Sequence, residues 1–399
     1  MQSQPFHDLI DWLIDGARSE AEPVAMMTRT CERLVAAGLP LYRVGVFVET
    51  LHPDVYGYGF VWRDGQETVT SETTVDVESL EEYQRSPLKL MYDTGVEVRF
   101  RLDDPVSRTF PFFDDMRREG VTDYLALPLK FMDGSINGSS FSTRRPGGFS
   151  DDELVALRRL TGPLARLIEV ISLRAIATTL LDTYVGNRAG ARILSGQIRR
   201  GHADTMRTAI WLSDLRGFTA LSDRLPPEVV VKLLNAYFDC QVGPILRNGG
   251  EVLKFMGDGL LAVFPIAADG GDEADVCARM LAAAQECRGT VAAMNYIEGN
   301  HIIETFRFGV ALHVGQVLYG NIGGGNRLDF TCIGPAVNLA ARLERIAGRL
   351  GRTVVASSDF VGLCSEGFVE IGEFPIEGLS HVERVYGLEA ETLQAAEGL

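Results

Sequence analysis

Two aspartates occupy positions from which each could ligate a divalent cation. Asp214 ends an apolar strand pattern in LSDLRGFTALS (212–222), and Asp258 lies at the glycine-flanked tip of a predicted hairpin in KFMGDGLLAVF (254–264). Taken singly, Asp214 could simply close a strand, and Asp-Gly is a common turn dipeptide. If the strands are neighbours, the two carboxylates meet at one end of a sheet. Mg²⁺ and Mn²⁺ prefer such oxygen ligands and share them with substrate phosphates.

A third segment adds a cation and an amide. LDFTCIGPAVNLAARLE (328–344) places Asn338 and Arg342 four residues apart, on one face of a predicted helix. A guanidinium group is well shaped to hold a phosphoryl group as negative charge develops on it. The simpler alternative is a solvated helix face on which Arg342 pairs with a nearby acid.

The three segments together resemble the catalytic domain of class III nucleotide cyclases, over about residues 205–388. The resemblance implies two Mg²⁺ or Mn²⁺ ions per site and ATP as substrate, whose ribose 3′-hydroxyl attacks the α-phosphorus and expels pyrophosphate. It also implies the following roles: Asp214 and Asp258 as metal ligands with the Leu215 carbonyl, Phe218, Thr219 and Gly257 near the phosphates, Asn338 orienting the ribose, and Arg342 stabilising the pentacoordinate phosphorus.

The same resemblance assigns the purine-reading positions to Lys254 and Thr331. A lysine donor suits N1 of adenine, and a threonine hydroxyl can accept from the N6 amine. Guanine-selective relatives carry Glu and Cys at these places. Cys332 is one residue away, and strand alternation directs it to the opposite face. The sequence therefore favours an adenylyl cyclase, with a guanylyl cyclase as the alternative.

Two positions depart from the family pattern. Glu377 stands where many cyclases carry a lysine that meets the terminal phosphates, and Gln316 where some carry an arginine. Arg349 or Arg352 could substitute by proximity. The departures predict weaker substrate binding, and they keep open a catalytically weak or silent cyclase-fold module.

The chain of 399 residues is long enough for two or three domains. We expect an α+β protein with a GAF-like sensor at 1–150, a connecting helix at 151–204, and a ferredoxin-like βααββαβ cyclase domain at 205–390. The GAF-like resemblance rests on element order alone. Its predicted strands are YRVGVFVET, YGYGFVW, EVRFRL, DYLALPLKF and GSSFST.

The connecting segment carries an apolar seam with helical spacing at Leu157, Leu160, Leu164, Leu167 and Ile171. Such a seam is typical of paired helices, and the alternative is one helix packed on its own domain. The cyclase resemblance independently implies a homodimer, in which each composite site takes metal ligands from one subunit and Asn338 and Arg342 from the other. An upstream module, answering to an unknown small molecule or protein, could then control activity.

In the C-terminal region we expect alternating strands, hairpins and helices, including a hairpin over 306–320, in an antiparallel sheet with helices on one face. The net charge of −16 argues against nucleic-acid binding. Six scattered cysteines predict no disulfide framework and a cytoplasmic location. The longest apolar stretch, 160–181, is interrupted by charges and is not expected to span a membrane.

Overall fold

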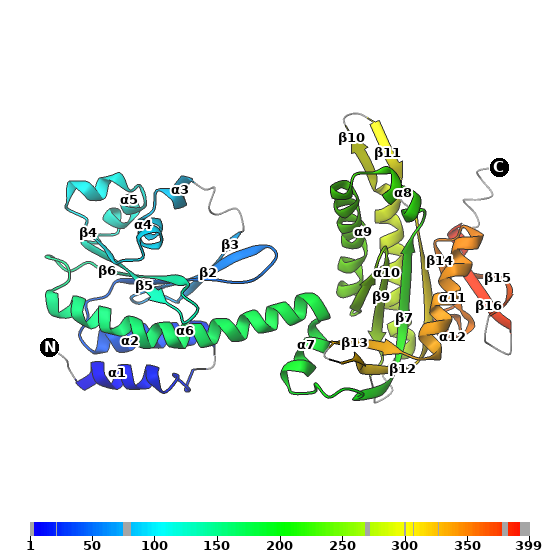
Figure 1. Ribbon diagram of the computed structural model, residues 1–399, viewed down its shortest axis with the longest axis horizontal. Helices are drawn as coiled ribbons and strands as arrows, with labels where there is room; N and C mark the ends of the chain where they lie inside the picture. The colour runs from blue at the N-terminus through cyan, green and yellow to red at the C-terminus, as the bar shows by residue number, and fades with distance from the viewer. Residues whose placement is uncertain are drawn as a thin grey trace. The chain divides into compact units, whose positions relative to one another are not determined.

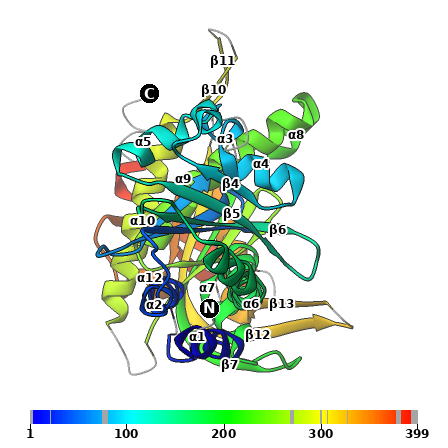
Figure 2. The same cartoon turned by 90° about the vertical axis from the view of Figure 1, so that its left-hand side faces the viewer.

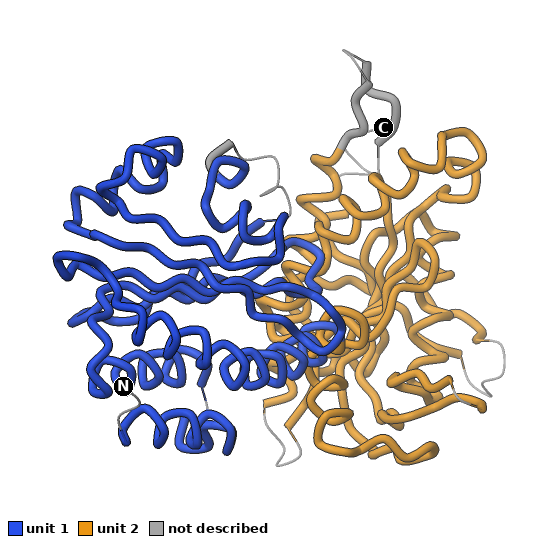
Figure 3. Tube along the Cα trace, turned by 60° about the vertical axis from the view of Figure 1, so that its left-hand side comes forward, with its two compact units in different colours: residues 1–180 blue, residues 181–399 orange. Residues whose placement is uncertain are grey.

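The computed structural model describes residues 4–20, 22–74, 81–267, 272–298, 301–305, 307–325, 327–376 and 382–391. Two compact units make up the chain, residues 1–180 and 181–399 (Figure 3). Each unit has its own sheet and its own apolar core.

Unit 1 contains a six-stranded sheet in the order β3-β2-β1-β6-β5-β4, with every neighbouring pair antiparallel. The strands are β1 (Arg43–Glu49), β2 (Val55–Arg63), β3 (Val69–Thr74), β4 (Val98–Arg101), β5 (Asp123–Lys130) and β6 (Ile136–Thr143). The five expected strands are present. β3 was not predicted, because its sequence VTSETT is polar, almost wholly exposed and without apolar alternation.

Helices cover both faces of this sheet (Figures 1 and 2). One face packs against α1 (Gln4–Ile14), α2 (Pro23–Ala36) and α6 (Asp151–Val185). The other carries α3 (Glu81–Gln84), α4 (Pro87–Thr94), the 3-10 turn Pro105–Thr109 and α5 (Phe112–Arg118). Phe113 and Tyr124 are fully buried under the second set, with ring centroids 5.1 Å apart.

The apolar seam of α6 packs inside unit 1, which corrects the expectation of a paired helix. Leu157, Leu160, Leu164 and Leu167 are buried in the same cluster as α1 and α2, and Ile171 packs against it. The helix also continues through Pro163. The seam residues are therefore buried in the core of their own domain, and they give no support to a dimer.

The connecting segment is two helices rather than one. α6 ends at Val185, Gly186 adopts a φ of 88°, and α7 (Asn187–Leu194) begins. A positive φ is open to glycine at little cost, so the chain turns here. Ala189 of α7 is buried against Ile210 of the unit 2 sheet.

Unit 2 contains an eight-stranded sheet in the order β15-β16-β14-β12-β7-β9-β8, with β13 paired to β12. Its strands are β7 (Ala203–Leu215), β8 (Glu251–Met256), β9 (Gly259–Pro265), β12 (Phe308–Gly324), β13 (Arg327–Ile333), β14 (Val354–Ser357), β15 (Phe368–Pro375) and β16 (Val382–Leu388). A separate two-stranded sheet joins β10 (Asn295–Glu298) and β11 (His301–Thr305).

Two expectations for this unit are wrong. The predicted hairpin over 306–320 is one long strand, β12, because Gly315 pairs with Thr208 of β7 instead of turning. A Cβ at Gly315 would lie 2.5 Å from the Cβ of Ala336. The absence of a side chain at this position therefore allows the helix that carries Ala336 to pack closely against the strand. The sheet is also mixed, since β12 and β14 are parallel.

Helices cover both faces of the sheet instead of one. α9 (Pro227–Arg247) and α10 (Glu273–Ala293) pack on the face that carries Trp211, while α11 (Pro335–Leu350) packs on the face that carries Ile210. The short helices α8 (Phe218–Arg224) and α12 (Ser358–Val361) complete the unit. Alternating side chains of β7 thus belong to two different cores.

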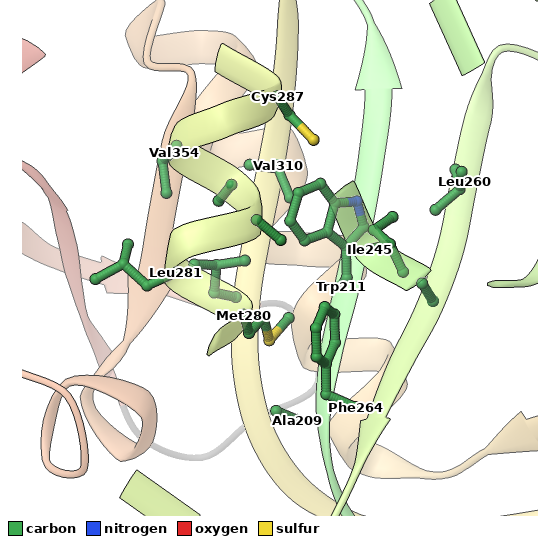
Figure 4. Packing of buried hydrophobic residues seen from close by; sticks show 14 of the residues in the cluster. Ala209, Trp211, Ile245, Leu260, Phe264, Met280, Leu281, Cys287, Val310 and Val354 are labelled. Atoms are coloured by element: carbon green, nitrogen blue, oxygen red, sulfur yellow. The ribbon is translucent and has the colours of Figure 1, made fainter. Parts of the chain in front are cut away.

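The larger core surrounds Trp211, which is fully buried (Figure 4). Phe264, Met280 and Val310 contribute to the same cluster, from β9, α10 and β12. Burying such side chains stabilises the fold by about 1.5–3 kcal/mol each. This core fixes the adjacent strands β7 and β9, whose ends carry the candidate site.

Among the described residues, α9 alone is long and apolar enough to cross a membrane by length and composition. Core helices of soluble proteins meet the same criterion, and α9 buries Leu233, Tyr237 and Ile245 in the core of unit 2. All six cysteines are free.

Candidate active site

The carboxylates of Asp214 and Asp258 lie together at one end of the unit 2 sheet. Asp214 is the penultimate residue of β7 and pairs with Gly259, the first residue of β9. Asp258 immediately precedes Gly259, in the tight turn between β8 and β9. A Cβ at Gly259 would approach the Ser213 carbonyl to 3.0 Å and Oδ1 of Asp214 to 3.4 Å. A side chain at this position would thus crowd the backbone at Ser213 and contact the Asp214 carboxylate.

This pair is electrostatically strained. Burial, followed by the negative charges of Asp258 and Glu344, raises the pKa of Asp214 to about 6, although Arg216 opposes the shift. A cation between the carboxylates would relieve their repulsion. The donor set suits Mg²⁺ or Mn²⁺, which are commonly held by one or two carboxylates together with substrate phosphates and waters. In the described part of the chain, no group of three or more His, Cys, Asp or Glu side chains is arranged so that it could hold a metal ion.

The backbone turns sharply after the first aspartate. Leu215 is buried and ends β7, and Gly217 adopts a φ of 76° as the residue before α8. Phe218 and Thr219 are the first two residues of that helix; Phe218 packs against the core, whereas Thr219 is exposed. The turn at Gly217 thus directs this short segment away from the strand end. Gly257, in the opposite turn, also has a positive φ of 66°.

Arg216, which follows β7, forms an ion pair with Glu344 of α11, and neither residue is among the site residues expected from the sequence. Nη1 of Arg216 lies 2.6 Å from Oε1 of Glu344, and Nη2 donates to the Glu344 carbonyl at 3.3 Å. This largely buried ion pair ties the residue two positions after Asp214 to α11. Both residues stand inside the quoted motifs, but the sequence gives no signal that they meet.

Lys254 and Thr331 are brought to the same neighbourhood. Nζ of Lys254 on β8 lies 3.6 Å from Oδ2 of Asp329, which stands two residues before Thr331 on β13. Thr331 is 6% exposed, and its Oγ1 is buried without a hydrogen-bond partner among the described residues. A buried unpaired hydroxyl is costly, so a ligand could satisfy it. Cys332 packs in the apolar cluster instead.

Asn338 and Arg342 occupy α11, where Asn338 is exposed and Arg342 half-buried. Arg342 lines a cavity of about 300 Å³ with Arg345, Arg349 and Ile376. Neither Asp214 nor Asp258 lines this cavity. Within one chain, the paired carboxylates are thus not among the residues that line the cavity of the α11 arginines.

Of the two positions that depart from the family pattern, only Gln316 lies within the described residues. Gln316 is exposed on β12. Glu377 lies outside the described residues, directly after Ile376 at the wall of the Arg342 cavity. Arg349 lines that same cavity, whereas Arg352 lines another one. Of the two proposed substitutes, only Arg349 is placed beside Arg342.

Most of this unit matches one family model of known proteins. Residues 202–389 match the model of the adenylate and guanylate cyclase catalytic domain. An adenylate cyclase of Anabaena cylindrica is 28% identical over 225 residues, which is 54% of this chain and 44% of that protein. An uncharacterized protein of Mycobacterium tuberculosis is 32% identical over 189 residues, 47% of this chain and 33% of its own length. The chain thus matches less than half of each of these relatives.

Solved structures similar to this chain include cyclases named for either nucleotide. A bacterial light-regulated adenylyl cyclase is 26% identical, covering 49% of this chain and 96% of its own, with a TM-score of 0.41. The guanylyl cyclase Cya2 is 28% identical, covering 47% of this chain and 93% of its own, with a TM-score of 0.40.

Proposed function

We propose that residues 202–389 form a class III nucleotide cyclase catalytic domain and convert ATP to 3′,5′-cyclic AMP and pyrophosphate within a homodimer. The observation that carries the proposal is the pairing of β7 with β9, which sets Asp214 beside Asp258 at one sheet end. Two divalent cations, Mg²⁺ or Mn²⁺, would there neutralise triphosphate charge and acidify the ribose 3′-hydroxyl.

The chain's own residues then have distinct tasks. Asp214 and Asp258 would hold the cations together with the Leu215 carbonyl, and Phe218, Thr219 and Gly257 would contact the phosphates. Asn338 orients the ribose, and Arg342 stabilises negative charge on the α-phosphoryl group as the ring closes.

The homodimer is supported by the division of the site within one chain. Asp214 and Asp258 do not line the cavity that Arg342 lines, as expected if a partner subunit supplies the complementary half of each site. Composite sites of this kind arise naturally at two-fold interfaces, where each subunit gives both halves once.

Adenine selectivity is proposed for Lys254 and Thr331. Incubating the protein with ATP or GTP and Mn²⁺, then separating the products by chromatography, tests it: cyclic AMP should predominate. Formation of cyclic GMP alone would reverse the base assignment, and the absence of both products would favour a silent module.

Replacing Lys254 by Glu and Thr331 by Cys should lower kcat/KM for ATP by about 10- to 100-fold for each hydrogen bond to adenine that is removed, and raise it for GTP. Steady-state kinetics with both nucleotides measure the change. Lys232→Glu makes the same charge change on the exposed part of α9 and should leave the ratio of the two kcat/KM values unaltered. An unaltered ratio in the double variant would show that these residues do not read the base.

We further propose that unit 1 is a GAF-like sensor of an anionic small molecule. Its cavity of about 510 Å³ is lined by Arg43, Arg63, Arg85, Phe112, Asp115, Met116 and Glu119, with Pro111. Arg43 is 8% exposed, its Nη1 has no hydrogen-bond partner in the described part of the chain, and burial lowers the pKa of its guanidinium group. Glu119 accepts a hydrogen bond from the Tyr42 hydroxyl at 2.9 Å.

Arg43→Met should raise the free energy of unfolding by about 1 kcal/mol without ligand, because replacing a buried unpaired charge by an apolar side chain is often stabilising. Thermal and urea unfolding measure this. Arg63→Met, which removes a half-buried cation 3.9 Å from Glu119, should give no such gain. A loss of stability in Arg43→Met would mean that the Arg43 charge is already compensated.

A further inference from the structure

Four arginines converge on a second cavity of unit 2, of about 260 Å³, and we propose that it binds a small phosphate-type dianion. Arg216 follows β7, Arg288 belongs to α10, Arg307 precedes β12, and Arg352 follows α11. The remaining walls are Val291, Ala292, Phe308, Gly348, Gly351 and Thr353. In a chain of net charge −16, this concentration of guanidinium groups is unusual and favours an anionic occupant.

Two of the guanidinium groups each have one buried nitrogen that is unsatisfied among the described residues. Nε of Arg288 and Nη1 of Arg352 are buried and make no hydrogen bond with the residues that the structure describes. Unsatisfied donors of charged groups are more costly than neutral ones. Phosphate oxygens match guanidinium nitrogens in geometry and can accept two parallel hydrogen bonds from each arginine.

The carboxylates nearest the cavity are already engaged. Glu344 is paired with Arg216 at 2.6 Å. Glu391 lies near Arg288 and Arg352, but its two oxygens accept the backbone amides of Thr353 and Val354, at 3.0 and 3.1 Å. Asp214 also lies close enough to Arg216 for their charges to interact. Four guanidinium groups still outnumber these three carboxylates, so the cavity keeps an excess of positive charge that favours an anion.

Arg216 links the cavity to the candidate active site, because it lines the cavity and lies two residues after Asp214. The backbone N–H of Arg216 donates to the Arg307 carbonyl at 2.8 Å, and its guanidinium group holds Glu344 of α11. An anion bound here would compete with Glu344 for Arg216, between the strand end that carries Asp214 and the helix that carries Arg342. This coupling rests on the proposed cyclase function, whereas anion binding itself does not.

Binding is tested in metal-free buffer with EDTA, where inorganic phosphate and pyrophosphate are titrated separately at constant ionic strength set by chloride. Thermal unfolding and calorimetry should show saturable binding in the wild-type protein, and the tighter of the two anions identifies the occupant. Arg288→Gln/Arg352→Gln should weaken it by about 10- to 100-fold. Arg247→Gln removes one exposed cation at the end of α9 that does not line the cavity, and it should bind as the wild type does.

The variant's own fold is checked without anion. Because the changes remove unsatisfied donors, Arg288→Gln/Arg352→Gln should unfold at the wild-type temperature or above in chloride alone. Absence of saturable binding in the wild type, or equal binding in wild type and double variant, would overturn the proposal. Either result can occur whether or not the protein forms cyclic AMP, so this proposal and the proposed function fail separately.

Discussion

Replacing Asp258 by Ala is expected to lower the rate of cyclic AMP formation by roughly 10³-fold or more, since a cation that stabilises several kcal/mol of transition-state charge loses a ligand. The measurement is initial rate with saturating ATP and Mn²⁺. The fold should survive, because Asp258 occupies a turn and its removal relieves repulsion of the half-buried Asp214. The free energy of unfolding should therefore stay within about 0.5 kcal/mol of the wild type, or rise.

Asp223→Ala is the matched control. Asp223 is an exposed carboxylate on α8, a few residues along the chain from Asp214, and no role is assigned to it. Its removal should leave the rate unchanged, so that loss of negative charge in the region is separated from loss of a ligand. Full activity in Asp258→Ala would eliminate the ligand role of that residue.

Arg342→Ala should reduce kcat by about 10²- to 10³-fold with a smaller change in KM, because its guanidinium group is assigned to charge that develops in the transition state. Steady-state kinetics separate the two constants. Arg384→Ala, an exposed arginine on β16 paired with Glu373, serves as control and should match the wild type. An effect confined to KM would make Arg342 a substrate-binding residue only.

The same two variants test the composite site when they are mixed. If each site takes its carboxylates from one subunit and Arg342 from the other, a heterodimer of Asp258→Ala and Arg342→Ala contains one intact site. Random exchange of subunits should then restore about a quarter of wild-type activity. No recovery after verified exchange would place all these residues in a site within one chain.

Local sequence signals anticipated the parts of the fold that local chemistry determines. The strand ending at Asp214 and the glycine-flanked turn at Asp258 were readable from apolar runs and turn residues, and β7 and β9 do pair. Their proximity needed the assumption that the two strands are neighbours. The roles of these residues, and of Asn338 and Arg342, remain predictions drawn from the family resemblance.

Non-local packing accounts for what the sequence did not reveal. The expected hairpin over 306–320 is one strand, because Gly315 pairs with Thr208 of β7 and the Ala336 Cβ packs closely against it. The α6 seam has the spacing of a paired helix. A helix that packs on its own domain core needs the same apolar stripe, so the sequence could not distinguish the two arrangements. The ion pair of Arg216 with Glu344 joins residues far apart in the chain, which no spacing rule could connect.

The most direct test of the central claim is a Mn²⁺ titration followed by electron paramagnetic resonance, with a non-cyclisable ATP analogue bound. Two Mn²⁺ ions per bound nucleotide are predicted for the wild-type protein, and loss of this stoichiometry for Asp214→Ala/Asp258→Ala with its fold intact. Unchanged Mn²⁺ binding in that double variant would contradict the account, because the cations would then be held elsewhere.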